Sequence, residues 1–532
     1  MPGSVPGEGP GRGVGVSHVT CASINRLGRV APQALPLFLL DYRPLTLNLT
    51  LTLTFPLMPS PSLVWFRLDL RLADNPALQA AIAAGGPVIP VYIHDPAAEG
   101  AWQPGGASNW WLHHALNDLA AQLDKAGSPL VIRQGDSLTE LQRLVQETGA
   151  GLVTWNRRHE PLIVERDTRV KTSLRNAGLK AESFNGNLLH EPHRVKTLAG
   201  NPFQVFTPFW KNCLANLKFG IPLKAPKKLP PSEQPLKSVP VAKLGLLPKI
   251  KWDGEFPVSW DPTRRAAEKR LKDFVAAPVK DYPTNRDIPK LDGTSRLSPY
   301  LHFGQISPLE IVDAVRTAGH LGVKGGDKYV AEVGWREFSQ HLIHHFPETP
   351  DRPLRREFEK FPWAPNKQHL RAWQLGRTGY PIVDAGMRQL WQTGWQHNRV
   401  RMIAASVLVK HLLQPWNEGA KWYWDTLVDA DLGANTMGWQ WAGGCGADAA
   451  PYFRVFNPVL QGEKFDPDGE YVRRWVPELA KLPAEWIHQP WEAPMHVLAE
   501  AGIKLGKDYP TPLVGLTAGR DRALKALKGM RP

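Results

Sequence analysis

Residues 429–458 read DADLGANTMGWQWAGGCGADAAPYFRVFNP, and the interpretation of the whole chain depends on this stretch. Its first thirteen residues hold two aspartates, one asparagine and two tryptophans. Gly433 and the glycines of 443–446 predict loop and short helix rather than one long helix. Trp439 and Trp441 are separated by one residue, so on an extended or irregular backbone their rings would point to opposite sides. One ring would then face an interior ligand and the other an outer cavity; two ordinary core aromatics are the alternative.

The composition indicates a large protein with a polyanionic partner. A chain of 532 residues with 42% apolar residues is long enough for two domains with separate cores. The net charge of +14 favours nucleic acid as the partner. The three cysteines show no CxxC or metal-ligand spacing, which favours a reducing compartment and no metal site. Of 21 tryptophans, 13 lie between Trp335 and Trp491, so the C-terminal half is expected to be rich in aromatic core residues.

Short apolar stretches alternate with amphipathic ones between residues 62 and 156. SLVWF, PVIPVYIH, PLVIRQ and GLVTWN read as strands with helices between them. This alternation predicts a doubly wound parallel sheet in an α/β domain over residues 58–190. Asp74 or Asn75 is the expected N-cap of the first helix. No glycine-rich dinucleotide fingerprint follows the first strand, which argues against a nicotinamide cofactor.

The remaining boundaries follow changes of composition. Residues 191–262 hold 12 prolines and several lysine-rich pieces, which predicts a partly extended interdomain linker on the surface. Residues 263–532 show helical periodicity throughout and are expected to form an all-α domain. Residues 1–57 are Gly/Pro-rich and then alternate Leu with Thr; we expect a disordered tail or a start-site artefact, with a targeting peptide as the alternative. Charges interrupt the apolar part of this leader, so no membrane span is expected.

Residues 429–458 resemble the flavin-pocket signature of the DNA photolyase/cryptochrome family, and the Trp-Gln-Trp form of 439–441 is similar to its class I cyclobutane pyrimidine dimer branch. The resemblance extends through 335–338 (WREF), 386–402 (GMRQLWQTGWQHNRVRM) and 63–76 (LVWFRLDLRLADNP). It implies an α/β antenna domain followed by a helical domain that binds FAD. The antenna would be a folate or a deazaflavin. Leu162 and Ile163 stand where folate-binding relatives carry an Asn-Glu pair, which argues against folate.

The segment 294–304, TSRLSPYLHFG, is a candidate phosphate site. Ser298 is the expected N-cap of a helix with Pro299 in its first turn, and the free N–H groups at a helix N-terminus favour anions. Capping alone explains the same residues. By the resemblance, this segment would hold the FAD pyrophosphate, Arg401 and Asp429 would form a buried pair beside the flavin, and Asn435 would adjoin flavin N5. The full set implied for FAD is Tyr282, Thr294, Ser295, Arg296, Leu297, Ser298, Arg401, Asp429, Ala430, Asp431 and Asn435.

Two pairs at helical spacing are candidates for substrate contacts. Glu332 and Trp335 are three residues apart and Asn398 and Met402 are four apart, so each pair shares one face of a helix. The resemblance implies that Glu332, partly desolvated, donates a hydrogen bond to a pyrimidine carbonyl as it becomes a radical anion, and that Asn398 and Met402 contact the dimer. A surface glutamate over a core tryptophan and an ordinary polar helix face are the alternatives. The full set implied for damaged DNA is Arg286, Glu332, Trp335, Asn398, Arg399, Met402, Trp441, Arg454 and Gln461.

Trp439, Trp416 and Trp363 resemble the three-tryptophan relay through which photoexcited flavin is reduced from the protein surface; ordinary core packing is the alternative. The predicted activity is light-driven DNA repair, in which reduced FAD passes an electron to a cyclobutane pyrimidine dimer and the dimer splits without a metal. A cryptochrome-type photoreceptor without repair is the main alternative, and a DASH-type repair protein and a DNA-binding scaffold without flavin are weaker ones. We expect a monomer without a membrane partner, in the cytoplasm and near the nucleoid in a bacterium.

Overall fold

A five-stranded parallel sheet forms the core of the first part of the chain. The computed structural model describes residues 59–216, 220–449 and 453–530, so the predicted leader lies outside the described residues. The strands lie in the order β3-β2-β1-β4-β5, which reverses at β1 as in a doubly wound sheet. Leu63 lies beside Ile89 of β2 and Val153 of β4. The strands are β1 (Ser62–Phe66), β2 (Val88–His94), β3 (Val131–Gln134), β4 (Leu152–Asn156) and β5 (Lys180–Phe184).

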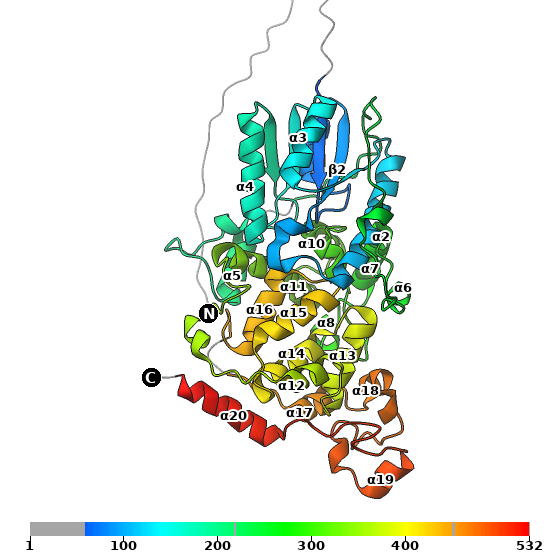
Figure 1. Cartoon of the computed structure of the whole chain (residues 1–532), viewed down its shortest axis with the longest axis vertical. Coiled ribbons are helices and arrows are strands. Elements are labelled where there is room, and N and C mark those ends of the chain that lie inside the picture. Colours follow the sequence, from blue (N-terminus) through cyan, green and yellow to red (C-terminus); the bar gives the residue numbers. More distant parts are fainter. Residues whose placement is uncertain (1–58, 217–219, 450–452, 531–532) are drawn as a thin grey trace, which may run out of the picture. The chain divides into compact units, whose positions relative to one another are not determined.

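Helices cover both faces of this sheet (Figure 1). Val64 and Phe66 pack with α1 (Pro76–Ala83) and α2 (Gly106–Lys125), whereas Leu63 and Trp65 pack with α3 (Ser137–Thr148) and α4 (Pro161–Asn176). Every residue of β1 is therefore buried, as expected for a parallel sheet covered on both sides. Asn75 is the N-cap of α1, where its side chain accepts a hydrogen bond from the Leu78 N–H. A short η1 segment (Pro96–Trp102) joins β2 to α2.

The proline-rich segment after β5 contains one long helix. The elements within residues 191–262 are η2 (Pro192–Arg194), α5 (Phe206–Asn216), η3 (Val241–Leu244) and α6 (Phe256–Ser259). Before η3 the chain lies against the α/β part. There the Leu229 N–H donates to the Ala126 carbonyl and the Val239 N–H donates to the Ile132 carbonyl. Helix α5 instead packs against a helix of the second part, α11 (Lys324–His345).

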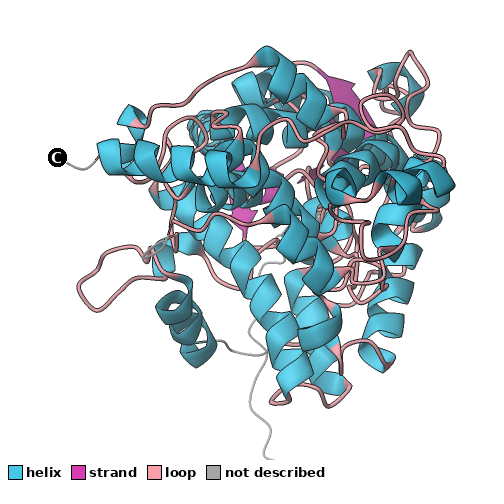
Figure 2. Ribbon diagram, turned by 90° about the horizontal axis from the view of Figure 1, so that it is seen from below, coloured by secondary structure: helices cyan, strands magenta, loops and turns pink. Residues whose placement is uncertain are grey.

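Among its described residues, the second part consists of helices and connecting loops and contains no strand (Figure 2). Part of its core joins aromatic and aliphatic side chains of residues 381–442. The α/β plus all-α fold class is therefore confirmed. In chain order the elements besides α11 are α7 (Arg264–Ala276), α8 (Tyr282–Asn285), α9 (Ser298–His302), α10 (Pro308–Thr317), η4 (Arg356–Lys360), α12 (Lys367–Gln374), α13 (Pro381–Thr393), α14 (Asn398–Ser406), η5 (Val407–His411), α15 (Trp416–Thr426), α16 (Leu432–Gly443), α17 (Pro458–Phe465), α18 (Glu470–Trp475), η6 (Pro477–Leu479), η7 (Pro490–Glu492), α19 (Met495–Glu500) and α20 (Leu516–Gly529).

The segment of the two tryptophans is a regular helix, so the expectation of an extended or irregular backbone there is wrong. Helix α16 runs through Gly433 and ends at Gly444, whose φ is +84°. Gly433 lies in the first turn, where an added Cβ would approach the Ser339 carbonyl oxygen to 2.9 Å. Packing against α11 therefore outweighs the weak helix preference of glycine. Positions two apart on a helix differ by about 200°, so the two rings still point to different sides.

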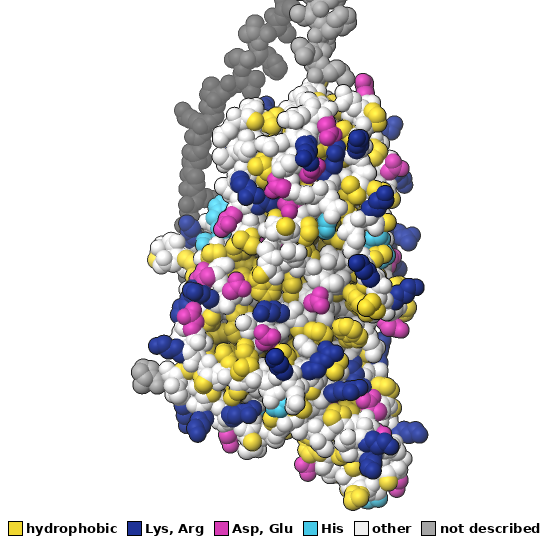
Figure 3. All heavy atoms as spheres, in the orientation of Figure 1, with side chains coloured by type: hydrophobic (Ala, Val, Ile, Leu, Met, Phe, Trp, Pro, Cys, Tyr) yellow, Lys and Arg dark blue, Asp and Glu magenta, His cyan; other side chains and the backbone are white. Residues whose placement is uncertain are grey.

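No helix within the described residues combines the length and the apolar character needed to cross a bilayer. The same residues contain no cluster of three or more His, Cys, Asp or Glu side chains arranged to hold a metal ion. Figure 3 shows hydrophobic side chains gathered over the middle of one face, where α14, α15 and α16 lie in Figure 1, with Lys and Arg side chains around them.

Candidate active site

A cavity of about 520 Å³ lies among α11, α14, α15 and α16. This volume falls in the range of small-molecule and cofactor sites. Ten of the residues selected from the sequence line it: Arg286, Glu332, Trp335, Asn398, Arg401, Met402, Asn435, Trp439, Trp441 and Arg454. Candidates for both the flavin and the substrate thus share one continuous space.

Glu332 and Trp335 lie one turn apart on α11, as their spacing predicted. The Glu332 carboxylate accepts a hydrogen bond from the Arg286 guanidinium, and Lys328 Nζ lies 3.4 Å from the same oxygen. Its side chain is 26% exposed. Glu332 is therefore held at the cavity between two cations, and Arg286 is positioned by this ion pair.

Helix α14 presents Asn398 and Met402 to the cavity on one face, with the Asn398 Nδ2 3.9 Å from the Met402 Sδ. Arg399 points elsewhere. Its guanidinium pairs with Asp287 at 2.8 Å and lies 4.3 Å from the centre of the Phe465 ring. Neither Arg399 nor Gln461 of α17 lines the cavity.

The flavin candidates divide between the cavity and its surroundings. Arg401 Nη2 lies 3.7 Å from Asp429 Oδ1, and the Asp429 side chain is 6% exposed. Arg401 Nε and Asp429 Oδ1 are buried without a hydrogen-bond partner, and Asn435 lines the cavity nearby. Buried polar atoms without partners are rare, so these two atoms fit a polar ligand such as the flavin ring. Arg401, Asp429 and Asn435 are the residues that would hold it.

The Asp431 carboxylate makes hydrogen bonds within the protein. Its carboxylate caps α16 by accepting from the Ala434 N–H at 2.8 Å, and it also accepts from Gln340 Nε2. Burial acts to raise the pKa of Asp431, but His302 and Arg336 outweigh it, so the pKa is lowered overall. Asp431 therefore positions α16 as an anion. Ala430 beside it is buried and lines a second cavity, which lies between the α/β part and helical-part residues such as His302 and Trp424.

In the predicted phosphate segment, residues 294–304, the N-cap of the helix is not the expected Ser298. Ser298 is the first residue of α9, and the N-cap is Leu297, which makes no side-chain hydrogen bond. The reason is a left-handed turn at Arg296, whose φ is +49°, after which the chain enters the helix at Leu297. The Arg296 guanidinium lies 4.8 Å from the Trp395 ring, and its Nε lies 3.4 Å from Asp292 Oδ1. Tyr282, Thr294 and Ser295 precede this turn, and none of them lines the cavity.

The three relay tryptophans belong to one core cluster and become more exposed along their predicted order. Trp439 lines the cavity and is 3% exposed, Trp416 is 5% exposed, and Trp363 is partly exposed in the loop before α12. Helices α15 and α16 approach closely because Gly419 faces the Trp439 indole, which an added Cβ would meet at 2.1 Å. Trp416 packs beside Gly443 across the same contact.

Sequence reasoning missed three polar residues of the cavity: Lys328, Tyr423 and Asp448. Lys328 is four residues before Glu332, a spacing that placed it on the same helix face. The Tyr423 ring lies edge-on to Trp439 at 5.0 Å, and its hydroxyl donates to Gln396 Oε1. Tyr423 follows Trp416 by two helical turns, and this spacing could have indicated that it shares a helix face with Trp416. Nothing in the sequence separates Asp448 from other loop aspartates.

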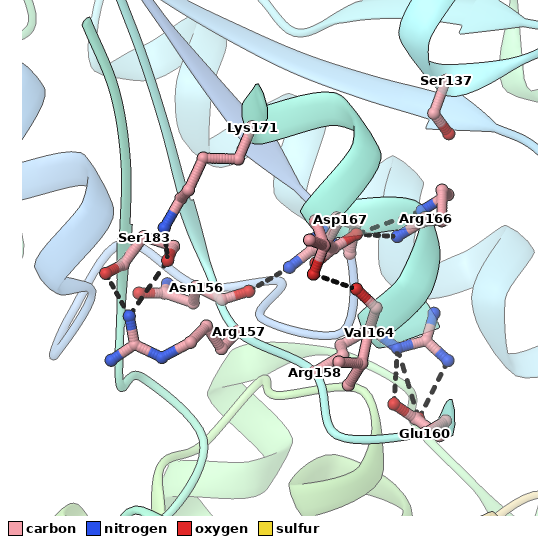
Figure 4. Close-up of polar contacts among 12 residues, drawn as sticks. Ser137, Asn156, Arg157, Arg158, Glu160, Val164, Arg166, Asp167, Lys171 and Ser183 are labelled. Atoms are coloured by element: carbon pink, nitrogen blue, oxygen red, sulfur yellow. Dashed lines mark hydrogen bonds and ion pairs between the residues drawn. The ribbon is translucent and has the colours of Figure 1, made fainter. Parts of the chain in front are cut away.

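The α/β part carries cavities at the carboxyl ends of its strands, where such sheets bind ligands. One of about 770 Å³ is lined by His94 at the end of β2, Gln134 at the end of β3 and Arg169 of α4. Leu162 lines it, whereas Ile163 is buried in the core. Figure 4 shows the ion pairs at the start of α4, where Arg158 lies 2.9 Å from Glu160. An antenna chromophore would bind in these cavities at the carboxyl ends of the strands.

Glu337, in the WREF segment, is a buried carboxyl group behind the cavity. It is 2% exposed and accepts hydrogen bonds from the Leu189 and His190 N–H groups at 2.9 and 3.1 Å. Burial raises its pKa from 4.5 to about 7, although Arg336 and the two N–H groups oppose the shift. The Glu337 carboxyl group therefore links α11 to the segment after β5, and below neutral pH it is largely protonated.

Replacing Glu337 with glutamine is expected to reduce the pH dependence of stability. As pH rises from 4.5 to about 7, the unfolded chain loses this proton while the folded chain keeps it, so the stability that is complete below pH 4.5 is lost by about pH 7. Glutamine retains an oxygen acceptor and cannot ionise. The melting temperature of Glu337→Gln relative to the parent should rise between about pH 5 and pH 8, corresponding to roughly 1–3 kcal/mol. A constant difference would contradict the assignment.

Comparison with known proteins agrees with this architecture. The family model "DNA photolyase" matches residues 62–232, and the model "FAD binding domain of DNA photolyase" matches residues 329–529. Deoxyribodipyrimidine photo-lyase of Agrobacterium fabrum is 48% identical over 89% of this chain and 99% of that protein. Cryptochrome-1 of Arabidopsis thaliana is 40% identical over 88% of this chain and 70% of that protein. A solved class III photolyase from Agrobacterium tumefaciens matches with a TM-score of 0.87 and 47% identity, over 90% of this chain and 99% of that one.

These similarities span both parts of the chain. The description of the solved relative as class III differs from the class I branch suggested by residues 439–441, and photolyases and cryptochromes are both similar to this chain. The similarity therefore establishes the family but does not distinguish a DNA repair enzyme from a photoreceptor. With an FAD-binding domain over residues 329–529 and a photolyase α/β domain before it, the chain belongs to the DNA photolyase/cryptochrome family.

Proposed function

We propose that the protein is a light-driven DNA repair enzyme that splits cyclobutane pyrimidine dimers. The observation that carries this proposal is that the flavin candidates Arg401 and Asn435 line the same cavity as Glu332, Trp335 and Met402. A cavity shared in this way would keep a flavin and an extruded pair of bases in contact. Reduced FAD, once bound and excited, would supply one electron to the dimer and recover it after the ring has opened, so the overall reaction would involve no net oxidation or reduction.

The cavity residues support binding of an extruded dimer. Trp335 and Trp441 offer aromatic surfaces for stacking, and Glu332 and Asn398 offer polar groups for the pyrimidine carbonyls. Arg454 is exposed at the same cavity, where it would contact phosphate. A dimer pairs and stacks poorly, so its extrusion from DNA costs less than that of normal bases.

Illumination of the purified protein tests the proposal. The flavin is first reduced chemically, an oligonucleotide with one thymine dimer is added, and dimer content is followed under blue light and in the dark. We expect dimers to disappear only in the light, on single- and double-stranded substrates tested in parallel. Dimers that persist in the light, with reduced flavin bound, would contradict the proposal.

That negative result would favour the second candidate, a photoreceptor without repair, which the similarity to Cryptochrome-1 of Arabidopsis thaliana supports. In that case light should still change the flavin redox state. An antenna pigment in the α/β cavities, a monomeric state and a cytoplasmic location beside DNA complete the proposal. Whether the pigment is a folate or a deazaflavin can be read from the absorption spectrum of the purified protein.

A further inference from the structure

The proline-rich segment reaches the wall of the cavity. Phe206, the first residue of α5, lies face to face with Trp335 of α11: the ring centres are 3.7 Å apart and the planes differ by 9°. Phe206 is buried, whereas Trp335 is partly exposed and lines the cavity. One face of the Trp335 indole is therefore covered by Phe206, which leaves the other for a ligand.

Other aromatic groups restrain this pair. Trp210, one turn along α5, lies nearly parallel to Phe206 at 6.3 Å, and Phe338 lies edge-on to both Phe206 and Trp335 at 5.9 Å. Close approach of α5 to α11 depends on Gly334, where an added Cβ would meet the Trp210 ring at 2.6 Å. The Trp335 indole is thus held on one face and one edge, so it has little freedom to rotate.

The same segment is joined to the opposite side of the cavity. The Asp448 N–H donates to the Gln204 carbonyl at 3.2 Å, and Asp448 lines the cavity with a left-handed backbone, φ +55°. Burial raises the pKa of Asp448, with the Phe206 N–H and Arg454 opposing the shift. Residues 204–206 therefore contact both α11 and the loop after α16, although they lie far from each in the sequence.

We propose that Phe206 is a positioning residue for recognition of the dimer, because it holds the Trp335 indole in the orientation that receives the extruded bases. This inference rests on the proposed function, since the ligand of Trp335 is taken to be the dimer. A stacked aromatic partner restricts the indole before the ligand arrives, so less conformational freedom is lost on binding. Phe206 touches neither DNA nor flavin in this scheme; it acts through Trp335.

The test measures dimer binding in Phe206→Leu. We expect its affinity for dimer-containing DNA to fall about five- to tenfold, with unchanged flavin content and with repair per absorbed photon at saturating DNA within about twofold of the parent. Phe206→Tyr, which keeps the stacked ring, should restore the affinity. In a Trp335→Ala background, Phe206→Leu should have no further effect, because the residue through which it acts is gone.

Phe209→Leu is the matched control. Phe209 is one turn from Phe206 on α5, is 1% exposed and packs on Phe338 and His341 rather than on Trp335. Its replacement removes the same volume from the same core and should leave dimer affinity within about twofold. An equal loss in Phe209→Leu, or an additive loss in the Trp335→Ala background, would overturn the proposal. If Phe206→Leu fails to retain flavin, Phe206→Met, which is closer in volume, takes its place with the same expectations.

A measurement without DNA separates this inference from the proposed function. In protein labelled with 5-fluorotryptophan, the ¹⁹F resonance of Trp335 is assigned by its absence in Trp335→Phe. We expect that resonance to shift or broaden in Phe206→Leu and to stay in place in Phe209→Leu. No change in Phe206→Leu overturns the positioning role. Failure of the parent to bind dimers, with the resonance responding as expected, instead refutes the repair proposal while the contact between the two rings stands.

Discussion

Trp416→Phe is expected to slow light-driven reduction of the bound flavin by roughly tenfold or more, which corresponds to about 1.4 kcal/mol or more in activation free energy. Phenylalanine is much harder to oxidise than tryptophan, so it cannot pass an electron inward at this position. Trp416 is the middle member of the predicted relay and is buried, whereas Trp439 lines the cavity and Trp363 is partly exposed. The measurement is the rate of flavin bleaching under blue light with an external reductant. Repair by chemically reduced protein should be unchanged.

Trp373→Phe is the matched control for this prediction. Trp373 is fully buried in the same cluster and lies edge-on to Trp439 at 5.9 Å, but it is not part of the predicted relay. Its replacement should leave photoreduction nearly unchanged. Equal rates in Trp416→Phe and the parent would refute the relay, and equal slowing in both variants would show that core packing rather than electron transfer was disturbed.

Glu332→Ala is expected to retain flavin and to lower repair per absorbed photon by about a hundredfold, the lower end of the range seen when one group that stabilises charge in a reaction is removed. Glu332 is the acidic member of a cluster with Arg286 and Lys328 at the cavity. Its loss would remove the group placed to contact a pyrimidine carbonyl. It would also leave Lys328 without this counter-charge and Arg286 with only Asp287, 3.9 Å away. The measurement is dimer splitting at saturating DNA with chemically reduced flavin.

Two further variants distinguish the parts of this cluster. Glutamine offers an amide N–H to a pyrimidine carbonyl without the charge of the carboxylate, so Glu332→Gln should repair better than Glu332→Ala. Arg286→Gln should weaken DNA binding more than it lowers repair per absorbed photon, because Arg286 is the positively charged partner of Glu332. Unchanged yield in Glu332→Ala would remove this residue from the reaction.

Local spacing predicted a large part of the structure and of the site. The alternation of apolar stretches over 62–156 predicted the parallel sheet, and Asn75 caps α1 as its position before Pro76 suggested. Glu332 and Trp335 share a face of α11, and Asn398 and Met402 share a face of α14, because helical spacing alone decides which residues are neighbours on one helix.

Two other features of the structure were not predicted. Ser298 is not the N-cap of α9, since the left-handed turn at Arg296 moves the cap to Leu297. Gln440, between the two tryptophans, points away from the cavity: its amide donates to the Thr349 and Arg352 carbonyls and accepts from the Leu354 N–H. Neither outcome follows from residue type or spacing.

The order of elements, the helix faces and the family-like residues of the cavity could thus be read from the amino-acid sequence, because they depend on neighbours within a few positions along the chain. Tertiary structure alone decided that Arg399 pairs with Asp287 outside the cavity, that Asp431 accepts a hydrogen bond from Gln340 of α11, and that Phe206 of a proline-rich segment covers one face of Trp335. Those contacts join residues remote in sequence, and side-chain packing selects them only once the helices have come together.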